Sequence, residues 1–354
     1  MDKSLVFKHE PILVFSQDER FFPMPIQTYV ECCSLHVQED KLTTMIVPPG
    51  YLSFEGLQAE GLFEKLSTKD HFLAYITQGT PEQIEQALRR FLEEPSTLRA
   101  MAAVAPVSAE AARLPFEAAV RVVIKALAEA ELKARREFWQ SILDLTQPLG
   151  RSEEVAQRAR QQYGETDAER PPYSYYYRVT QNKGYDVIQY WYFYAYNPHL
   201  NDHEGDWESV TLFLKYDQPL YAAYSAHSGR ALHAWNTLNI QDGHPLVYAA
   251  LGSHANYSKP GAVELPDVFF AESKRIGQHA GATPWASEEM DRQLWLSFGG
   301  HWGTCLARPW YRRLLDYITL HMLREKLPYV NNGPLGPSQE RTAWNDPVAY
   351  AGLK

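Results

Sequence analysis

Eight consecutive residues, 201–208, concentrate side chains that bind metal ions or move protons. The segment reads Asn-Asp-His-Glu-Gly-Asp-Trp-Glu. If a strand begins near Asp206, then Asp206 and Glu208 point to the same side of it, together with the apolar Val210. Two carboxylates on one apolar face repel each other and lose hydration, so they need a cation, a shared proton or an arginine partner.

A histidine in the same segment completes a set of metal ligands. Gly205 lets the chain turn sharply, so His203 can reach the same point as the two carboxylates. One imidazole and two carboxylates suit a divalent ion such as Mg²⁺, Ca²⁺, Mn²⁺ or Zn²⁺. The sequence therefore predicts a divalent-metal site formed by His203, Asp206 and Glu208. A polar turn whose carboxylates point to solvent is the alternative that the residues leave open.

Two histidines at the ends of expected strands are candidates for a general acid or base. His227 is followed by Ser-Gly, and His254 follows Gly-Ser. Imidazole is the side chain that most often transfers protons near neutral pH. A hydrogen-bonded structural histidine is the competing interpretation for each of them.

A stripe of tyrosines precedes the polar segment. Residues 187–196 alternate, and positions 190, 192, 194 and 196 are all tyrosine. One face of the expected strand therefore presents rings and hydroxyls, and Tyr192, Tyr194 and Tyr196 are candidates for the wall of a ligand pocket. A sheet face covered by other elements is equally consistent with the pattern.

The elements that must position these residues are mostly strands. Apolar or alternating runs bounded by turn residues lie at 11–15, 207–215, 220–228 and 244–251. No helical pattern separates the last three runs, which indicates antiparallel pairing in a sandwich or barrel.

Residues 80–165 follow a different pattern. Thr80-Pro81-Glu82-Gln83 has the composition of a capped helix start, and apolar residues then recur every three or four positions from Phe116 to Leu145. We therefore predict an α+β fold class, with an antiparallel β-sandwich core and an inserted α-helical block. Residues 1–79 and 166–354 would form the sandwich domain that carries the metal site, and residues 80–165 the helices.

Charge and composition exclude several classes of protein. The chain has 354 residues, 34 Lys and Arg, 43 Asp and Glu, and a net charge of −9. This acidic balance, without a basic run, argues against nucleic acid as a partner. No run of apolar residues approaches the length of a membrane span, so no transmembrane segment is predicted. The amino terminus lacks the apolar core of a secretory signal, and we expect a cytoplasmic location.

The segment His-Glu-Gly-Asp-Trp-Glu-Ser-Val-Thr-Leu closely resembles the core of the vacuolar protein sorting-associated protein 62 family. Three further segments, 224–229, 245–257 and 333–345, fit that family in the same order, and residues 11–23 are similar to its opening. A more distant likeness runs to the necrosis- and ethylene-inducing peptide-like proteins, whose His-x-x-Asp-Trp-Glu segment lines a cation site in a β-sandwich.

The more distant likeness implies specific roles for residues of this chain. It implies that His203, Asp206 and Glu208 are ligands of a cation, and it places His227 near the ion. Tyr196 or Asn197 stands where those proteins have an upstream aspartate.

Two functions from different classes are consistent with these residues. The first is a metal-dependent enzyme that acts on a small molecule in an aromatic-lined pocket, with His227 or His254 as acid or base. The second is a non-enzymatic protein whose cation bridges to a sugar or lipid headgroup. The grouping of ligands, histidines and aromatic residues favours the first. Both predict a divalent metal ion as cofactor and a small molecule or headgroup as partner.

Overall fold

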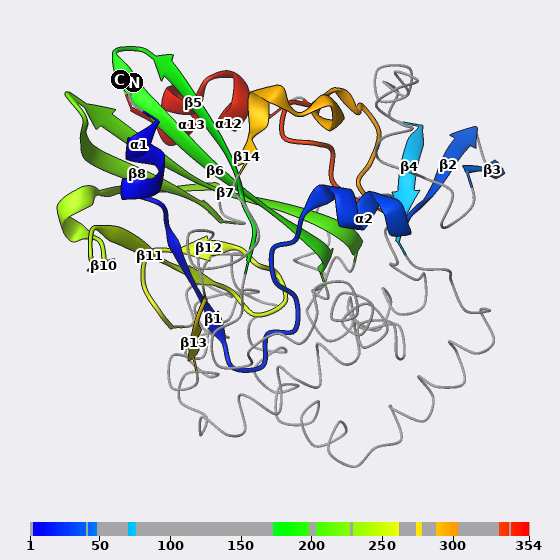
Figure 1. The fold of residues 1–354 in the computed structure, drawn as a ribbon, viewed down its shortest axis with the longest axis horizontal. Coiled ribbons are helices and arrows are strands. Elements are labelled where there is room, and N and C mark those ends of the chain that lie inside the picture. The colour runs from blue at the N-terminus through cyan, green and yellow to red at the C-terminus, as the bar shows by residue number, and fades with distance from the viewer. Residues whose placement is uncertain are drawn as a thin grey trace, which may run out of the picture.

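Strands predominate in the computed structural model, and they form three sheets (Figure 1). The structure describes residues 3–39, 42–47, 70–75, 173–197, 203–226, 229–261, 274–277, 288–303, 333–339 and 341–353. No helix among these residues is long and apolar enough to cross a membrane.

The largest sheet has six strands in the order β14-β5-β6-β7-β8-β9. Its strands are β5 (Tyr176–Asn182), β6 (Tyr185–Asn197), β7 (His203–Lys215), β8 (Gln218–Ala226), β9 (Gly229–Ala234) and β14 (Glu288–Glu289). Neighbours from β5 to β9 pair antiparallel, whereas β14 pairs parallel with β5. Two-residue turns with positive φ, Lys183-Gly184 and Tyr216-Asp217, connect β5 to β6 and β7 to β8, because such turns match the twist of a hairpin.

A second sheet has the order β10-β11-β1-β13, with β12 paired to β11. Its strands are β1 (Ile12–Ser16), β10 (Ile240–Gln241), β11 (His244–Ala249), β12 (Asn256–Tyr257) and β13 (Lys274–Ile276). The amino-terminal β1 pairs parallel with β11, so residues more than 200 positions apart in the chain are direct neighbours.

The remaining described elements are short. A third sheet contains β2 (Ser34–Glu39), β3 (Leu42–Val47) and β4 (His71–Ala74) in the order β3-β2-β4. The α-helices are α1 (Ser4–Lys8), α2 (Ile26–Cys32), α12 (Thr342–Asn345) and α13 (Pro347–Ala351), and the 3-10 helices are η1 (Trp235–Thr237), η3 (Met290–Arg292) and η4 (Leu294–Ser297).

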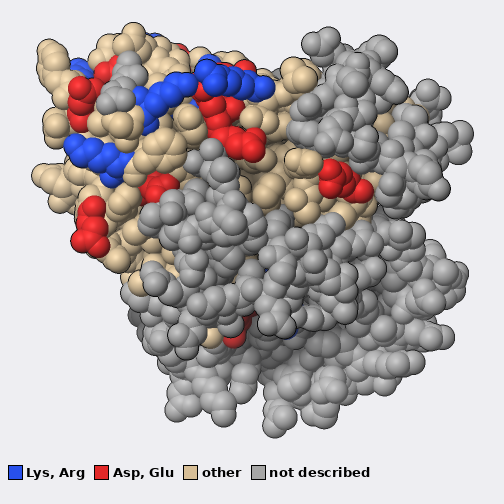
Figure 2. Space-filling view, viewed as in Figure 1, with Lys and Arg blue, Asp and Glu red and all other residues tan. Residues whose placement is uncertain are grey.

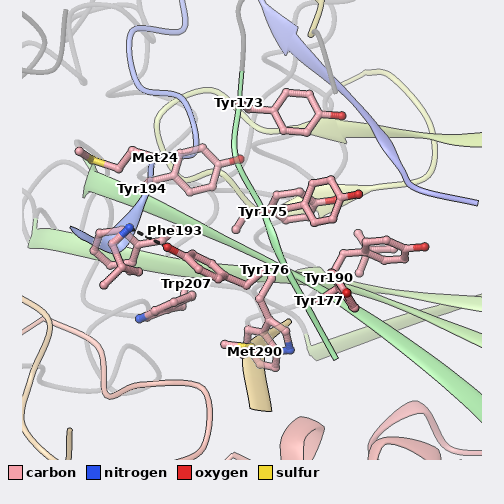
Figure 3. Packing of buried hydrophobic residues seen from close by; sticks show 14 of the residues in the cluster. Met24, Tyr173, Tyr175, Tyr176, Tyr177, Tyr190, Phe193, Tyr194, Trp207 and Met290 are labelled. Atoms are coloured by element: carbon pink, nitrogen blue, oxygen red, sulfur yellow. Dashed lines mark hydrogen bonds between the residues drawn. The ribbon is translucent and has the colours of Figure 1, made fainter. Parts of the chain in front are cut away.

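The tyrosine stripe lies in the core between the two larger sheets. Tyr190, Tyr192 and Tyr194 are completely buried and belong to one cluster with Phe15 of β1 and Val247 of β11. Figure 3 shows Tyr190 and Tyr194 within this cluster. The other face of the same sheet packs through indole rings. These are Trp191, Trp207, Trp295, Trp302 and Trp344.

The surface of the described part carries charges of both signs close together (Figure 2). Lys3 and Arg292 both contact Glu289, and Arg178 contacts Asp291. Positive side chains on these elements are therefore partly neutralised by acidic neighbours.

The predicted α+β fold class with an antiparallel sandwich is wrong for the part of the chain that the structure describes. Only one of the four α-helices there, α2, has seven residues, and two strand pairs, β1 with β11 and β5 with β14, are parallel. Local alternation locates a strand but contains no information about the direction of a partner far along the chain, which explains the error. The helical block predicted at 80–165 lies outside the described residues.

Candidate functional site

The polar segment forms the first residues of β7, next to the last residues of β6. His203 pairs with Asn197, Asp206 with Tyr194, and Glu208 with Tyr192. Residues opposite each other in an antiparallel pair share a face, so Asp206 and Glu208 lie on the tyrosine side of the sheet. The alternation in the sequence predicted this shared face.

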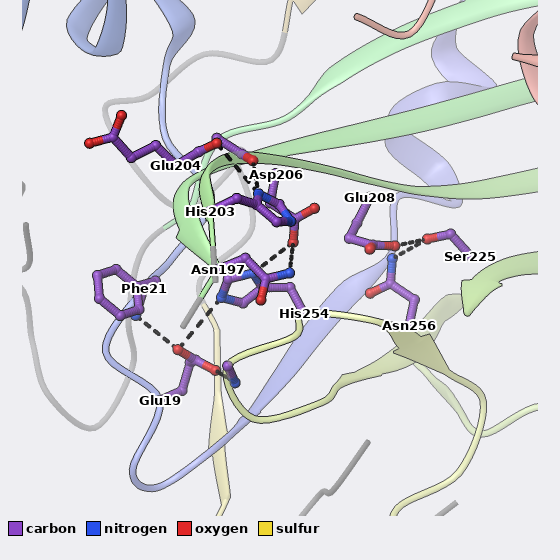
Figure 4. Close-up of polar contacts among 12 residues, drawn as sticks. Glu19, Phe21, Asn197, His203, Glu204, Asp206, Glu208, Ser225, His254 and Asn256 are labelled. Carbon is purple, nitrogen blue, oxygen red and sulfur yellow. Dashed lines mark hydrogen bonds and ion pairs between the residues drawn. The ribbon is translucent and has the colours of Figure 1, made fainter. Parts of the chain in front are cut away.

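The positive φ of Gly205, inside β7, sets the directions of the side chains on either side of it. Gly205 has φ +67°, and a Cβ atom there would lie 1.9 Å from the carbonyl oxygen of Trp302. Glu204 points away from Asp206, and its carboxylate accepts a hydrogen bond of 3.0 Å from the backbone N–H of Tyr75 (Figure 4). Glycine is required at 205 by both the backbone conformation and the close approach.

The Asp206 carboxylate is held by two side chains. Its Oδ2 accepts a hydrogen bond of 3.1 Å from the amide of Asn197 and lies 3.0 Å from Nδ1 of His254. The other ring nitrogen of His254, Nε2, lies 3.7 Å from Oε1 of Glu19. The imidazole also stacks on Tyr194, with ring centroids 3.9 Å apart and an interplanar angle of 3°. His254 thus stands between two carboxylates and against an aromatic ring.

The environment of His254 favours its charged form. Burial is the largest influence and lowers its pKa, but the hydrogen bonds to Asp206 and Glu19 outweigh it and raise the pKa to about 9. The same contact keeps the pKa of Glu19 below its ordinary value, although burial acts in the opposite direction. At neutral pH the site therefore contains an imidazolium between two carboxylates.

Glu19 ties two distant loops together. Its Oε1 accepts hydrogen bonds from the backbone N–H groups of Arg20 and Phe21, at 2.9 and 3.0 Å. Its Oε2 accepts one of 2.8 Å from the N–H of Gly252. The loop that follows β1 is therefore fastened to the turn that carries His254.

His203 is buried and has a defined tautomer. Its Nδ1 lies 2.8 Å from the carbonyl oxygen of Gly205, and because a carbonyl can only accept, Nδ1 carries the proton. Burial lowers the pKa of His203, and the charge of Asp206 is the largest opposing influence. The neutral ring then has its lone pair on Nε2.

Glu208 belongs to a separate group of contacts. It accepts a hydrogen bond from the hydroxyl of Ser225, whose oxygen in turn accepts from the N–H of Ser209 at 2.9 Å and from the amide of Asn256 at 3.3 Å. The structure therefore brings His203, Asp206 and His254 together but not Glu208 (Figure 4). In the described part of the chain, no group of three or more His, Cys, Asp or Glu residues has the arrangement of a metal site.

The other predicted site residues have different outcomes. His227 lies outside the described residues. Tyr192, Tyr194 and Tyr196 are fully buried, and Tyr196 packs edge-on against Phe21 with centroids 5.4 Å apart. As arranged here, these three tyrosines are core residues, and their role in substrate binding stays a prediction.

Sequence reasoning missed most of the residues that hold the site together. These are Glu19, Asn197, Ser225 and Asn256. Each of them had a signal only through the resemblance: Glu19, Ser225 and Asn256 lie in segments similar to the resembled family, and Asn197 is one of the two residues at the place of the upstream aspartate. Polar residues in separate loops have no shared spacing that would connect them before the chain is folded.

The segment that carries this site matches a known family model. Residues 197–268 match the family model described as vacuolar protein sorting-associated protein 62. The resemblance to this family is confirmed. The protein of that name from Saccharomyces cerevisiae is 30% identical in an alignment of length 176 that covers 37% of this chain and 37% of the yeast protein. The alignment thus spans little more than a third of the length of the yeast protein, to which this chain is similar.

Solved structures of toxin-like proteins are more distant. Necrosis and Ethylene inducing Protein 2, from the causal agent of cocoa's Witches Broom disease, is 20% identical over 31% of this chain and 52% of its own, with a TM-score of 0.23. NLPPya in complex with mannosamine is 14% identical over 51% of this chain and 68% of its own, with a TM-score of 0.27. TM-scores this low do not establish a shared fold.

Proposed function

We propose that this chain binds a divalent cation through His203 and Asp206 at the start of β7. The observation that supports the proposal is the buried imidazole of His203, whose Nδ1 donates to the carbonyl of Gly205. Histidines that bind metals in proteins usually donate their second nitrogen to a carbonyl or carboxylate in this way, which leaves the other nitrogen as the ligand. The carboxylate of Asp206 supplies the charge that a divalent ion requires.

Glu208 is the third ligand expected from the sequence. Its carboxylate is bonded to Ser225 in this structure, so we assign the ion first to His203 and Asp206. A nitrogen and carboxylate oxygens suit Zn²⁺ or Mn²⁺ better than an ion that prefers oxygen alone. When bound, the ion would polarise an oxygen atom of a ligand.

The geometry favours a binding protein over an enzyme. Proton transfer needs an acid or base that can reach the substrate. His254 is 0% exposed, and both of its nitrogens face carboxylates. We therefore propose that the cation holds a polar small molecule or a headgroup, and that His254 transfers no proton. The metal-dependent enzyme predicted from the sequence would depend on His227.

Metal titration of the full chain tests this proposal. Isothermal titration calorimetry with Zn²⁺, Mn²⁺, Ca²⁺ and Mg²⁺, together with elemental analysis, should give a single site. His203→Gln and Asp206→Asn should weaken binding by more than the roughly 10- to 100-fold that follows loss of an outer-shell partner. His233→Gln and Asp186→Asn are matched controls outside the site. A wild-type chain that binds none of the four ions would refute the proposal.

A further inference from the structure

We infer that His254 and Glu19 are positioning residues for Asp206, which makes the amino-terminal segment part of the cation site. This inference rests on the proposed function. It assigns a role to two residues that bind no ion themselves and act only through the orientation of the Asp206 carboxylate.

The contacts with His254 and Asn197 fix one carboxylate oxygen of Asp206. Oδ2 of Asp206 lies 3.0 Å from Nδ1 of His254 and accepts from Asn197 at 3.1 Å. Two directional contacts on one oxygen restrict the rotation of the carboxyl group. A ligand held in a single orientation pays less entropy when the ion binds, and its affinity for the ion rises.

The orientation of His254 is in turn determined from three sides. Tyr194 stacks on the ring and sets its plane, while Asp206 and Glu19 lie at its two nitrogens. The backbone of His254 has φ +59°, a conformation that costs free energy for any residue except glycine. Such a conformation persists where the surroundings over-determine it, which is common at functional sites.

Glu19 fastens this arrangement to the amino-terminal part of the chain. Its carboxylate accepts hydrogen bonds from the backbone N–H groups of Arg20, Phe21 and Gly252, which link the loop after β1 to the turn before β12. Glu19 lies in the loop after β1 and Asp206 lies in β7, and His254 is between them (Figure 4). A change at Glu19 should therefore reach the ion although Glu19 and His203 are 184 residues apart in the sequence.

Two substitutions distinguish a role in orienting Asp206 from a role in folding. His254→Asn removes the ring but keeps a residue type that tolerates positive φ. Glu19→Gln keeps the length and an acceptor for the backbone N–H groups but removes the charge that faces His254. Glu10→Gln and His233→Asn are the matched controls. Glu10 is also a buried glutamate, bonded to the hydroxyl of Tyr175, and His233 contacts Ser258.

The test is to titrate the wild-type chain and the four variants with Zn²⁺ and Mn²⁺, and to measure a thermal melt of each. We expect His254→Asn and Glu19→Gln to raise the Kd of the ion by about 10- to 100-fold, whereas the controls lower Tm and leave Kd unchanged. If His254→Asn does not fold, Glu19→Gln alone decides the outcome. Wild-type affinity in both site variants, or an equal loss in the controls, overturns the inference while the proposed function stands. A wild-type chain that binds no ion overturns both.

Discussion

Asp206 and Glu208 share a face of β7, yet their hydrogen-bond partners differ. The sequence argument required a cation, a shared proton or an arginine beside them. Asp206 has the imidazolium of His254, Glu208 accepts a hydrogen bond from the hydroxyl of Ser225, and the charge of Arg341 acts on both carboxylates. A buried histidine between carboxylates was not among the partners considered, because only the folded chain places residue 254 beside residue 206.

Single hydroxyl groups of the tyrosine stripe should differ in their effect on stability. The hydroxyl of Tyr190 donates a hydrogen bond of 2.7 Å to the carbonyl of Val6, so Tyr190→Phe should lower the free energy of unfolding by about 1 kcal/mol. The hydroxyl of Tyr192 is buried and makes no hydrogen bond to the described residues, so Tyr192→Phe should be neutral or stabilising. Urea unfolding of the two variants measures the difference, and equal losses would contradict the assignment.

At the level of elements, three glycines allow the start of β7 to pack closely on other segments: Gly205 of β7 itself, and Gly303 and Gly333 of its neighbours. Gly205 approaches Trp302, while a Cβ atom at Gly303 or Gly333 would lie 1.9 or 2.5 Å from the carbonyl oxygen of Glu204. The segments around 303 and 333 therefore pack directly on the backbone that carries His203. The Gly-Pro-Leu-Gly-Pro segment beginning at 333 helps to position the site from outside it.

Gly205→Ala should be among the more damaging single substitutions. It adds a clash with the backbone of Trp302 to the cost of a positive φ, and we expect a loss of about 3 kcal/mol in the free energy of unfolding. Gly184→Ala is the matched control, since Gly184 has φ +79° but no atom within 4 Å of an added Cβ. Chemical denaturation of the two variants measures the loss in the free energy of unfolding that each substitution causes. A loss no larger than that of the control would show that the close approach is unimportant.

At the scale of the whole molecule, the chain ends and the site depend on contacts between distant segments. α1 and β1 pack against residues from the second half of the chain. His9, at the end of α1, is buried against Trp235 with ring centroids 5.6 Å apart, and its Nδ1 lies 3.4 Å from the carbonyl of Gly243.

Acid should destabilise the protein through His9. Burial, the main cause, lowers its pKa below 6.5, although the contact with Gly243 opposes this shift. Between the lowered folded pKa and the unfolded value, the unfolded chain binds more protons, so the free energy of unfolding falls as the pH drops below about 6.5. His9→Phe keeps a ring against Trp235 and should reduce this pH dependence. Urea unfolding between about pH 8 and pH 5 measures it, and an unchanged slope in the variant would refute the assignment.

Local sequence correctly located most strands near the site. The alternation at 187–196, the run at 207–215 and the run at 244–251 became β6, β7 and β11. Side-chain alternation is a property of the extended backbone itself, so the shared face of Asp206 and Glu208 needed no tertiary information. The resemblance to the vacuolar protein sorting-associated protein 62 family was likewise readable from the segment 203–212.

Only the tertiary structure decided what surrounds these residues. The parallel pairing of β1 with β11 brings Glu19 to Gly252 and His254, and His254 to Asp206. The same packing assigns Glu208 to Ser225 and encloses the tyrosine stripe between two sheets. These contacts join residues that are up to 235 positions apart, and neither periodicity nor spacing connects positions so distant. They form because burial of both sheets in one core selects a single arrangement of the strands, and the polar side chains then meet at its edge.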